Sequence, residues 1–220
     1  QLMTMRDGTE IVGKRYILNE QLGAGGMGTV YQAQDRLTGT TIALKKVSTV
    51  NDPTFLSPDE AGEDYRLALA QEFKVLASLR HPHVISVIDY GFDEDRQPFY
   101  TMELLSEAAT ILDAAEGRSV ERRTELMVQV LQALVYLHRR GIIHRDLKPR
   151  NVLVEKDQVK VLDFGLSVVR EQSALVSNTS GTLAYMAPEV LTDGLVTEAA
   201  DLYAVGVMGY ELFIGKHPFD

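Results

Sequence analysis

The hydrophobic pattern of the 220-residue chain changes its period near Leu105. Before that residue, short segments alternate apolar and polar side chains between turn-forming residues, a pattern typical of antiparallel strands. After it, apolar residues recur every three to four positions over long stretches, which predicts helices. Strands in one half and helices in the other predict an α+β protein with two lobes. We expect lobes at about 10–103 and 107–220, joined by a hinge at about 103–106.

The two halves contain different expected elements. In the first half we expect strands at 16–22, 29–34, 40–47, 83–92 and 98–105, a long exposed connection at 48–65 and a helix at about 65–79. In the second half we expect helices at 122–139 and about 199–214, short strands within 151–162 and a polar loop at 167–182. His81 before Pro82 ends the first helix, and Gly141 ends the second.

Composition excludes several classes of protein. The net charge is -9, from 22 Lys and Arg against 31 Asp and Glu, so a general basic surface for nucleic acid is not expected. The absence of cysteine excludes disulfides and thiolate metal sites. The apolar stretches are too short for a bilayer span, and the first ten residues show no signal peptide. We therefore expect a soluble, cytoplasmic protein without a membrane segment.

A glycine cluster follows the first strand. Gly23, Gly25 and Gly28 have the spacing G-x-G-x-x-G, which lets the backbone approach phosphate oxygens and offer N–H donors. A dinucleotide-binding fold requires a helix directly after such glycines, whereas the next residues here predict a strand and a turn. The remaining alternatives are a phosphate-binding hairpin and a tight hairpin without a ligand.

Lys45 lies on the third expected strand, and Glu72 lies on the helix that follows. Lysine on an edge strand is usually just solvated. The position of Glu72 on the same side of its helix as Leu69 and Leu76 points the carboxylate toward the sheet, however. A Lys45–Glu72 pair there would direct the ammonium group at a polyphosphate.

Opposed charges gather in the segment 142–154, between two apolar runs. Asp146 and Asn151 there, with Asp163 further on, provide oxygen donors beside strands, a set that suits Mg²⁺ better than zinc. The four histidines other than His144 have no ligand spacing and are interpreted as structural. A buried ion pair of Asp146 with Arg145 is the alternative, but burying this many charges without compensation is costly, which favours a ligand site.

At this point the sequence resembles the eukaryotic-type protein kinase family, in order and over nearly the whole chain. The matching segments are a glycine-rich loop at 23–30, a strand lysine at Lys45 with its helix partner Glu72, a catalytic loop at 144–151, a metal-binding triplet at 163–165 and the end of an activation segment at 187–189. Lys148 and the pair Gly181-Thr182 are the Ser/Thr-specific forms. The GGMG wording of the glycine loop is most similar to bacterial Ser/Thr kinases.

The resemblance implies that ATP lies between the lobes and that protein substrates receive its γ-phosphoryl group. It implies that Asp146 accepts the proton of a Ser or Thr hydroxyl, that Lys148 steadies the transferring group and that Asn151 and Asp163 bind Mg²⁺. Lys45, held by Glu72, would contact the α- and β-phosphates. The implied adenine contacts are Leu22, Val30, Ala43, Met102, Glu103, Leu105 and Leu153.

The resemblance also bears on regulation and association. Arg145 is expected to pair with a phosphate on the loop 167–182, and we predict autophosphorylation at Thr179 or Ser177. The sequence stops at Asp220, before helices that complete the large lobe in the family, so an exposed apolar patch and self-association are expected. The main alternative is a nucleotide-binding regulatory module without catalysis. A small-molecule kinase is disfavoured, because such enzymes lack this activation segment.

Overall fold

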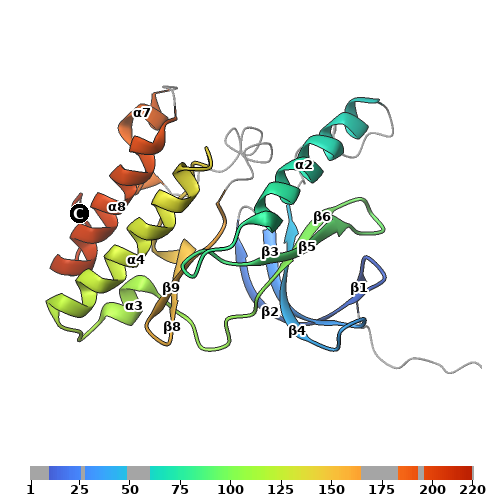
Figure 1. Ribbon diagram of the computed structural model, residues 1–220, viewed down its shortest axis with the longest axis horizontal. Helices are drawn as coiled ribbons and strands as arrows, with labels where there is room; N and C mark the ends of the chain where they lie inside the picture. The colour runs from blue at the N-terminus through green and yellow to red at the C-terminus, as the bar shows by residue number, and fades with distance from the viewer. Residues whose placement is uncertain (1–9, 26–27, 49–59, 165–182, 193–195, 220) are drawn as a thin grey trace, which may run out of the picture. The chain divides into compact units, whose positions relative to one another are not determined.

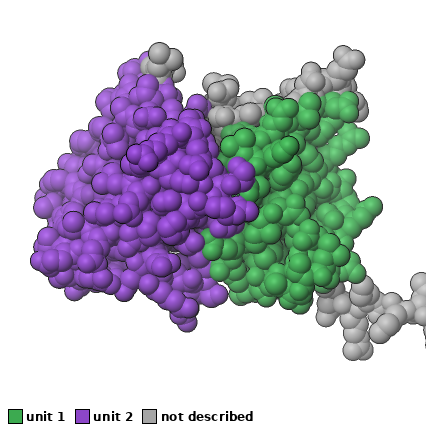
Figure 2. Space-filling view, in the orientation of Figure 1, with its two compact units in different colours: residues 1–77, 87–104 green, residues 78–86, 105–220 purple. Residues whose placement is uncertain are grey.

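The computed structural model describes residues 10–25, 28–48, 60–164, 183–192 and 196–219. The chain divides into two compact units, coloured separately in Figure 2. Unit 1 comprises residues 1–77 and 87–104, and unit 2 comprises residues 78–86 and 105–220. The short segment 78–86 therefore groups with the helical part of the chain, although it lies between two strands of unit 1 in the sequence.

Where it is described, unit 1 consists of a six-stranded antiparallel sheet and one helix (Figure 1). The strand order is β1-β2-β3-β4-β6-β5. The strands are β1 Ile11–Val12, β2 Tyr16–Gly25, β3 Gly28–Asp35, β4 Thr41–Val47, β5 Val87–Phe92 and β6 Pro98–Met102, and the helix is α2 Glu60–Ser78. Helix α2 begins about five residues before its predicted start, because Glu60 and Ala61 are strong helix formers that extend it through Gly62. The end of the expected connection at 48–65 is therefore helical.

The core of unit 1 comes from residues of opposing strands that alternate toward the inner face. It comprises Val12, Tyr16, Leu18, Ala33, Ile42, Leu44 and Phe99. Helix α2 attaches to the sheet through Phe73, whose ring lies 5.6 Å from that of Tyr90 and 5.5 Å from that of Tyr100, measured between centroids. These aromatic contacts fix the side of α2 that faces the sheet.

A charged network joins three parts of unit 1. The Arg15 guanidinium donates to both carboxylate oxygens of Asp35, at 2.8 and 2.7 Å, and to Asp89 Oδ2 at 2.8 Å. The Tyr16 hydroxyl also donates to Asp89 Oδ2, at 2.8 Å. Hydrogen bonding by Arg15 holds the pKa of the Asp35 carboxyl well below its usual range. The network ties the β1–β2 turn to β3 and β5.

Unit 2 is mainly helical and carries a small antiparallel sheet of order β7-β8-β9. The helices within its described residues are α3 Ile111–Ala115, α4 Val120–His138, η1 Pro149–Asn151, α7 Pro188–Leu191 and α8 Glu198–Ile214, and the strands there are β7 Ala109–Thr110, β8 Val152–Glu155 and β9 Gln158–Val161. Ser119 caps the start of α4, and Thr197 caps the start of α8. Gly215, with φ 81°, ends α8 in the left-handed conformation that glycine adopts without strain.

Helices α4 and α8 lie side by side in unit 2 (Figure 1). Arg123, in the first turn of α4, donates to the carbonyl oxygen of Leu212 at 3.0 Å, near the end of α8. This contact places a cation at the negative end of the α8 dipole. None of the described helices is both long enough and apolar enough to cross a membrane.

Candidate active site

Asp146 lies at the centre of a polar loop between α4 and β8. Lys148 Nζ lies 3.1 Å from Asp146 Oδ1 and 2.9 Å from Oδ2, and the Asn151 amide donates to Oδ2 at 3.0 Å. The Asp146 side chain is 10% exposed and that of Lys148 is 20% exposed. The structure thus brings together three residues that the sequence predicted as a site, with the carboxylate still accessible from solvent.

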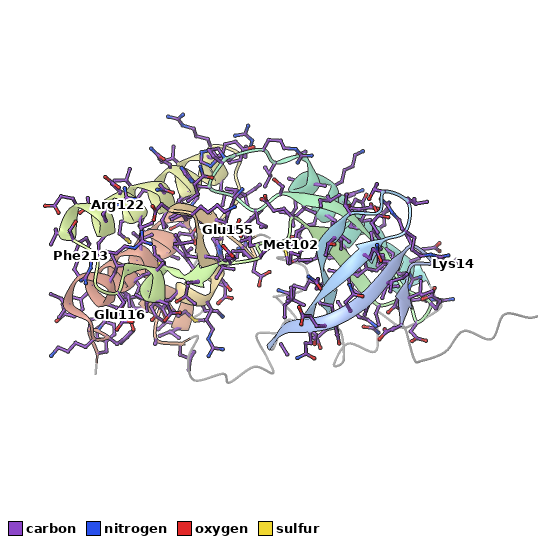
Figure 3. All side chains as sticks on the ribbon, turned by 90° about the horizontal axis from the view of Figure 1, so that it is seen from below. Lys14, Met102, Glu116, Arg122, Glu155 and Phe213 are labelled. Atoms are coloured by element: carbon purple, nitrogen blue, oxygen red, sulfur yellow. The ribbon has the colours of Figure 1, made fainter. Side chains whose placement is uncertain are left out.

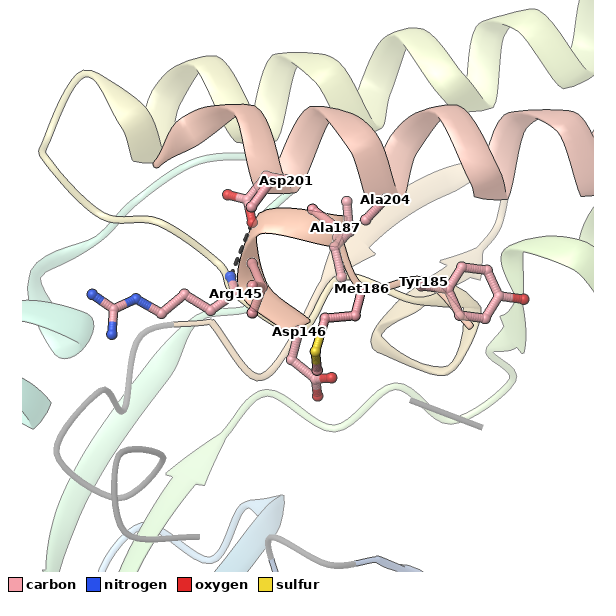
Figure 4. A pocket seen from close by; sticks show the side chains of 10 residues that line it. Arg145, Asp146, Tyr185, Met186, Ala187, Asp201 and Ala204 are labelled. Atoms are coloured by element: carbon pink, nitrogen blue, oxygen red, sulfur yellow. Dashed lines mark hydrogen bonds between the residues drawn. The ribbon is translucent and has the colours of Figure 1, made fainter. Parts of the chain in front are cut away.

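Asp201, on α8, holds this loop through hydrogen bonds to its backbone. Its carboxylate, on a residue that is 1% exposed, accepts the backbone N–H groups of His144 at 2.8 Å and Arg145 at 2.9 Å. His138 Nε2, at the end of α4, lies 2.8 Å from the same carboxylate. Arg145 has φ 67°, a strained value for a residue with a side chain, and the contact drawn in Figure 4 holds its backbone there.

His144 is fully buried and connects the loop to the chain before Phe164. Its Nδ1 accepts the Asp146 N–H at 3.3 Å, so in the neutral ring Nε2 carries the proton and donates to the Leu162 carbonyl oxygen at 2.8 Å. The His144 and Phe164 rings pack edge to face, with centroids 6.3 Å apart. Through His144, the backbone of Asp146 is tied to Leu162 and Phe164.

Asn151 and Asp163 offer oxygen atoms in the same region of unit 2. Both N–H donors of the Asn151 amide are directed at Asp146, at its carbonyl oxygen 2.8 Å away and at Oδ2, which leaves the amide oxygen for a cation. The Leu162 N–H donates to the Asn151 carbonyl oxygen at 2.9 Å, which positions the neighbouring Asp163. An amide oxygen and a carboxylate fit Mg²⁺ when phosphate oxygens supply further ligands. Within the described ranges, no group of three or more His, Cys, Asp or Glu side chains is placed to hold a metal alone.

Unit 1 contains most of the predicted nucleotide contacts. Val30 pairs with Lys45 across β3 and β4, and Ala43 pairs with Met102 across β4 and β6. Met102 is the last residue of β6 (Figure 3). Lys45 is 3% exposed, so its ammonium group is withdrawn from bulk water. A buried charge of this kind requires charged partners.

The remaining predicted contacts are distributed over both units. Leu22, Glu72 and Glu103 belong to unit 1. Leu22 lies on β2 and is 47% exposed, Glu72 lies on α2, and Glu103 directly follows β6. Leu105 and Leu153 belong to unit 2. The predicted phosphorylation sites Thr179 and Ser177, and Gly165 of the metal-binding triplet, lie outside the described residues.

The three predicted glycines differ in how much space surrounds their Cα atoms. A Cβ atom at Gly23 or Gly25 would meet nothing within 4 Å, so both glycines border open space. Gly28 has φ 132°, and a Cβ atom there would lie 2.0 Å from the Lys46 carbonyl oxygen. Gly28 is therefore required by the β3–β4 pairing itself, whereas Gly23 and Gly25 leave room for a ligand to approach the hairpin.

A small pocket that the sequence did not predict opens beside Asp146 in unit 2 (Figure 4). Its lining comprises Arg145, Asp146, Leu147, Tyr185, Met186, Ala187, Val190, Ala200, Asp201 and Ala204. The Met186 side chain points toward Asp146, and the Tyr185 hydroxyl donates to Glu211 on α8. Nothing in the local sequence pattern identifies these partners, because they come from segments far apart along the chain.

A glycine hairpin on an antiparallel sheet, together with a helical unit that presents an Asp–Lys–Asn loop, defines a kinase-like class of protein. The family model described as the protein kinase domain matches residues 16–220, and the chain belongs to this family. The predicted resemblance and the α+β fold class are thereby confirmed.

Several named relatives are Ser/Thr kinases. The chain is 37% identical over 226 residues to the DNA damage-responsive serine/threonine-protein kinase RqkA of Deinococcus radiodurans, with 99% of this chain and 32% of the relative covered. It is 32% identical over 223 residues to the probable serine/threonine-protein kinase pknA2 of Bifidobacterium longum, covering 99% and 29%. It is 34% identical over 235 residues to the serine/threonine-protein kinase pkn3 of Myxococcus xanthus, covering 99% and 42%. The chain thus spans less than half the length of these bacterial relatives.

Proposed function

We propose that this protein transfers the γ-phosphoryl group of ATP to Ser and Thr hydroxyls of protein substrates. The arrangement of Asp146, Lys148 and Asn151 carries the proposal. A carboxylate that is mostly buried, yet open to solvent at one edge, is suited to accept a hydroxyl proton at Oδ1 or Oδ2. The names of the relatives support a protein substrate with Ser or Thr acceptors.

The loop gives each polar group a separate task. The Asn151 amide orients the Asp146 carboxylate, and the backbone contacts to Asp201 prevent the loop from relaxing. Lys148, already within 3.1 Å of Asp146, can turn its ammonium group toward the transferred phosphoryl without leaving the loop. Such fixed charges lower the barrier because they need no reorganisation during the reaction.

Asn151 and Asp163 would hold Mg²⁺ through their side-chain oxygens. When bound, the ion offsets charge on the β- and γ-phosphate oxygens. Lys45, positioned by Glu72, would contact the α- and β-phosphates. The adenine ring would pack against Leu22, Val30, Ala43, Met102 and Leu153, and backbone groups of Glu103 and Leu105 would bind its polar edge.

The test is phosphoryl transfer from γ-labelled ATP, with Mg²⁺, to a Ser/Thr protein substrate. Asp146→Asn keeps the size of the side chain and removes the proton acceptor, so we expect kcat to fall by about 10²–10⁴-fold. The control is Glu94→Gln, an equal charge change at an exposed turn of unit 1. Equal labelling by the two variants would refute the assignment.

We further propose that phosphorylation of the segment 167–182, first at Thr179 and also at Ser177, regulates the activity. A phosphoryl group there would pair with a nearby cation, and Arg145 is the candidate. Phosphopeptide mapping after incubation with Mg-ATP tests this. A stoichiometric site elsewhere, with none in this segment, would contradict the proposal.

Self-association is the predicted partner interaction that can be tested directly. Helix α8 exposes a set of apolar side chains, Leu202, Tyr210, Phe213 and Ile214. A helix that is apolar on most sides usually has a partner. Sedimentation velocity over a concentration series would detect self-association, and a constant monomer mass would exclude it.

A further inference from the structure

A basic cluster lies where the segment 78–86 meets the end of α4 and β9, all within unit 2. We define the basic cluster as His81, His83, Arg140 and Lys160. Arg140 is exposed, and the other three residues are half-buried. The cluster is unusual for a chain with a net charge of -9.

Tyr136 organises this cluster. Its ring stacks on that of His81 with centroids 4.8 Å apart, and the Arg140 guanidinium carbon lies 3.8 Å from the centroid of the same ring. The Tyr136 hydroxyl accepts the Arg80 N–H at 2.7 Å, which fixes the ring. The aromatic ring therefore holds an imidazole and a guanidinium close together, although both groups can be cationic.

The hydrogen bonds determine which imidazole nitrogens can face a ligand. His81 Nδ1 accepts the His83 N–H at 3.2 Å, so in its neutral form His81 carries the proton on Nε2. His83 Nδ1 lies 3.2 Å from the Val159 carbonyl oxygen and must donate to it. Nε2 of His81 is thus an N–H donor already in the neutral ring.

The surroundings of Arg140 differ from those of several other basic side chains. Arg15, Lys46, Arg118, Arg122 and Lys148 each form an ion pair with a carboxylate. The side-chain contacts of Arg140, in the part of the chain that the structure describes, are the ring and the carbonyl oxygen of Tyr136. Burial, together with the nearby His83, Arg140 and Lys160, lowers the pKa of His81.

We propose that the basic cluster is a binding site for a phosphate group, separate from Asp146. A phosphate dianion offers three acceptor oxygens, which match a guanidinium fork beside an imidazole Nε2–H. It would also offset the charge of the Arg140 guanidinium that lies beside His81 on the Tyr136 ring. The group can come from inorganic phosphate or from a phosphorylated Ser or Thr of a polypeptide.

The site predicts a particular dependence on pH. The lowered pKa means that His81 is mostly neutral near pH 7 in the free protein. Bound phosphate stabilises the protonated ring, so it must raise the pKa of His81. By linkage, protonation of His81 favours phosphate binding, whereas protonation of the phosphate dianion, with its second pKa of about 6, opposes it, so the two effects must be separated by following His81 itself. Tyr136, His83, Arg140 and Lys160 are the titratable or charged groups that face His81 from the neighbouring elements.

The experiment follows the imidazole ¹⁵N resonances of His81 while inorganic phosphate, or a phosphoserine peptide, is titrated into the 220-residue protein at constant ionic strength. ATP is absent, so the outcome is independent of catalysis by Asp146. Arg140→Gln should weaken binding by about tenfold, the effect of losing one charge-assisted hydrogen bond. Arg139→Gln is the matched control, because Arg139 is equally exposed and adjacent but does not act on His81.

A saturable rise in the pKa of His81 that needs about tenfold more phosphate in Arg140→Gln and is unchanged in Arg139→Gln supports the proposal. Lys160→Gln supplies a second variant, with a smaller expected loss. Tighter binding of the peptide identifies a phosphorylated protein as the partner, and equal binding identifies free phosphate. If chloride shifts His81 as much as phosphate does, or if the two arginine variants behave alike, the proposal is overturned.

Discussion

Asp201 can be used to test whether α8 holds the active-site loop in its working shape. Its buried carboxylate accepts the N–H groups of His144 and Arg145, at 2.8 and 2.9 Å, and contacts His138 Nε2 at 2.8 Å. Asp201→Ala removes all three acceptor contacts and leaves no oxygen in their place. Asp201→Asn keeps one acceptor oxygen but points an NH₂ group at the other donor.

The expected cost follows from the number of unsatisfied donors. A buried N–H without an acceptor costs about 1–3 kcal/mol, so Asp201→Ala should lower the free energy of unfolding by about 2–6 kcal/mol. Asp201→Asn loses one of the two backbone contacts and should cost about half as much, roughly 1–3 kcal/mol. The first figure is a large part of the about 5–15 kcal/mol that stabilises a typical domain.

Amide hydrogen exchange at His144 and Arg145 gives the local readout, and urea unfolding followed by circular dichroism gives the global one. Glu198→Ala is the control, since Glu198 is exposed in the first turn of α8 and should cost less than about 1 kcal/mol. If Asp201→Ala costs less than about 1 kcal/mol and both amides remain protected, the loop is held by other contacts and our reasoning fails.

Three further predictions concern unit 1 and the active-site loop. Because Arg15 lowers the pKa of Asp35, the ionised Asp35 carboxylate stabilises the folded protein; this stabilisation is complete above the unfolded pKa of about 3.9 and is lost as the pH falls through the lower folded value. In Asp35→Asn the melting temperature should therefore depend less on pH in this range, and an unchanged dependence would contradict the prediction. Gly28→Ala should destabilise by about 2 kcal/mol or more because its Cβ atom would overlap the backbone of β4, whereas Gly23→Ala, bordering open space, should cost less than about 1 kcal/mol in thermal unfolding; equal losses would show that the clash is relieved. Lys148→Met should lower kcat about 10²-fold, with a smaller change in KM, in steady-state kinetics, and a change confined to KM would assign Lys148 to binding alone.

Much of the fold could be predicted because local patterns determine it. Helices α4 and α8 have clear apolar periodicity and caps, so their observed bounds lie within about two residues of the predicted ones. The strands of unit 1 were predicted in place but not all in length, because β2 ends at Gly25 rather than at residue 22, β5 begins at Val87 rather than at residue 83, and β6 ends at Met102 rather than at residue 105. The two-residue strands β1 and β7 were not predicted. Strands that short have no period to detect, and their pairing partners alone define them.

The candidate site also has a part that the sequence predicted and a part that it did not. Asp146, Lys148 and Asn151 are close in sequence, so their residue types and spacing already indicated a shared task. The contact of Tyr185 with Glu211 joins residues 26 positions apart, and His138 was interpreted only as structural, without its contact to Asp201. Such partners depend on how α4, α8 and the loops pack, which spacing along one segment does not contain.

The backbone explains why this loop depends so heavily on distant residues. Arg145 and Asp163 both have positive φ, 67° and 58°, and neither is glycine. Each such conformation costs about 1 kcal/mol or more and persists only where surrounding contacts impose it. For Arg145 the contact is the buried carboxylate of Asp201, and for Asp163 the preceding residue is bonded to His144 and Asn151. Glycine at either position would relieve the strain, but it would also free the backbone beside the proposed base and the proposed metal ligand. The strained residues are therefore consistent with a loop whose geometry is fixed before any ligand binds.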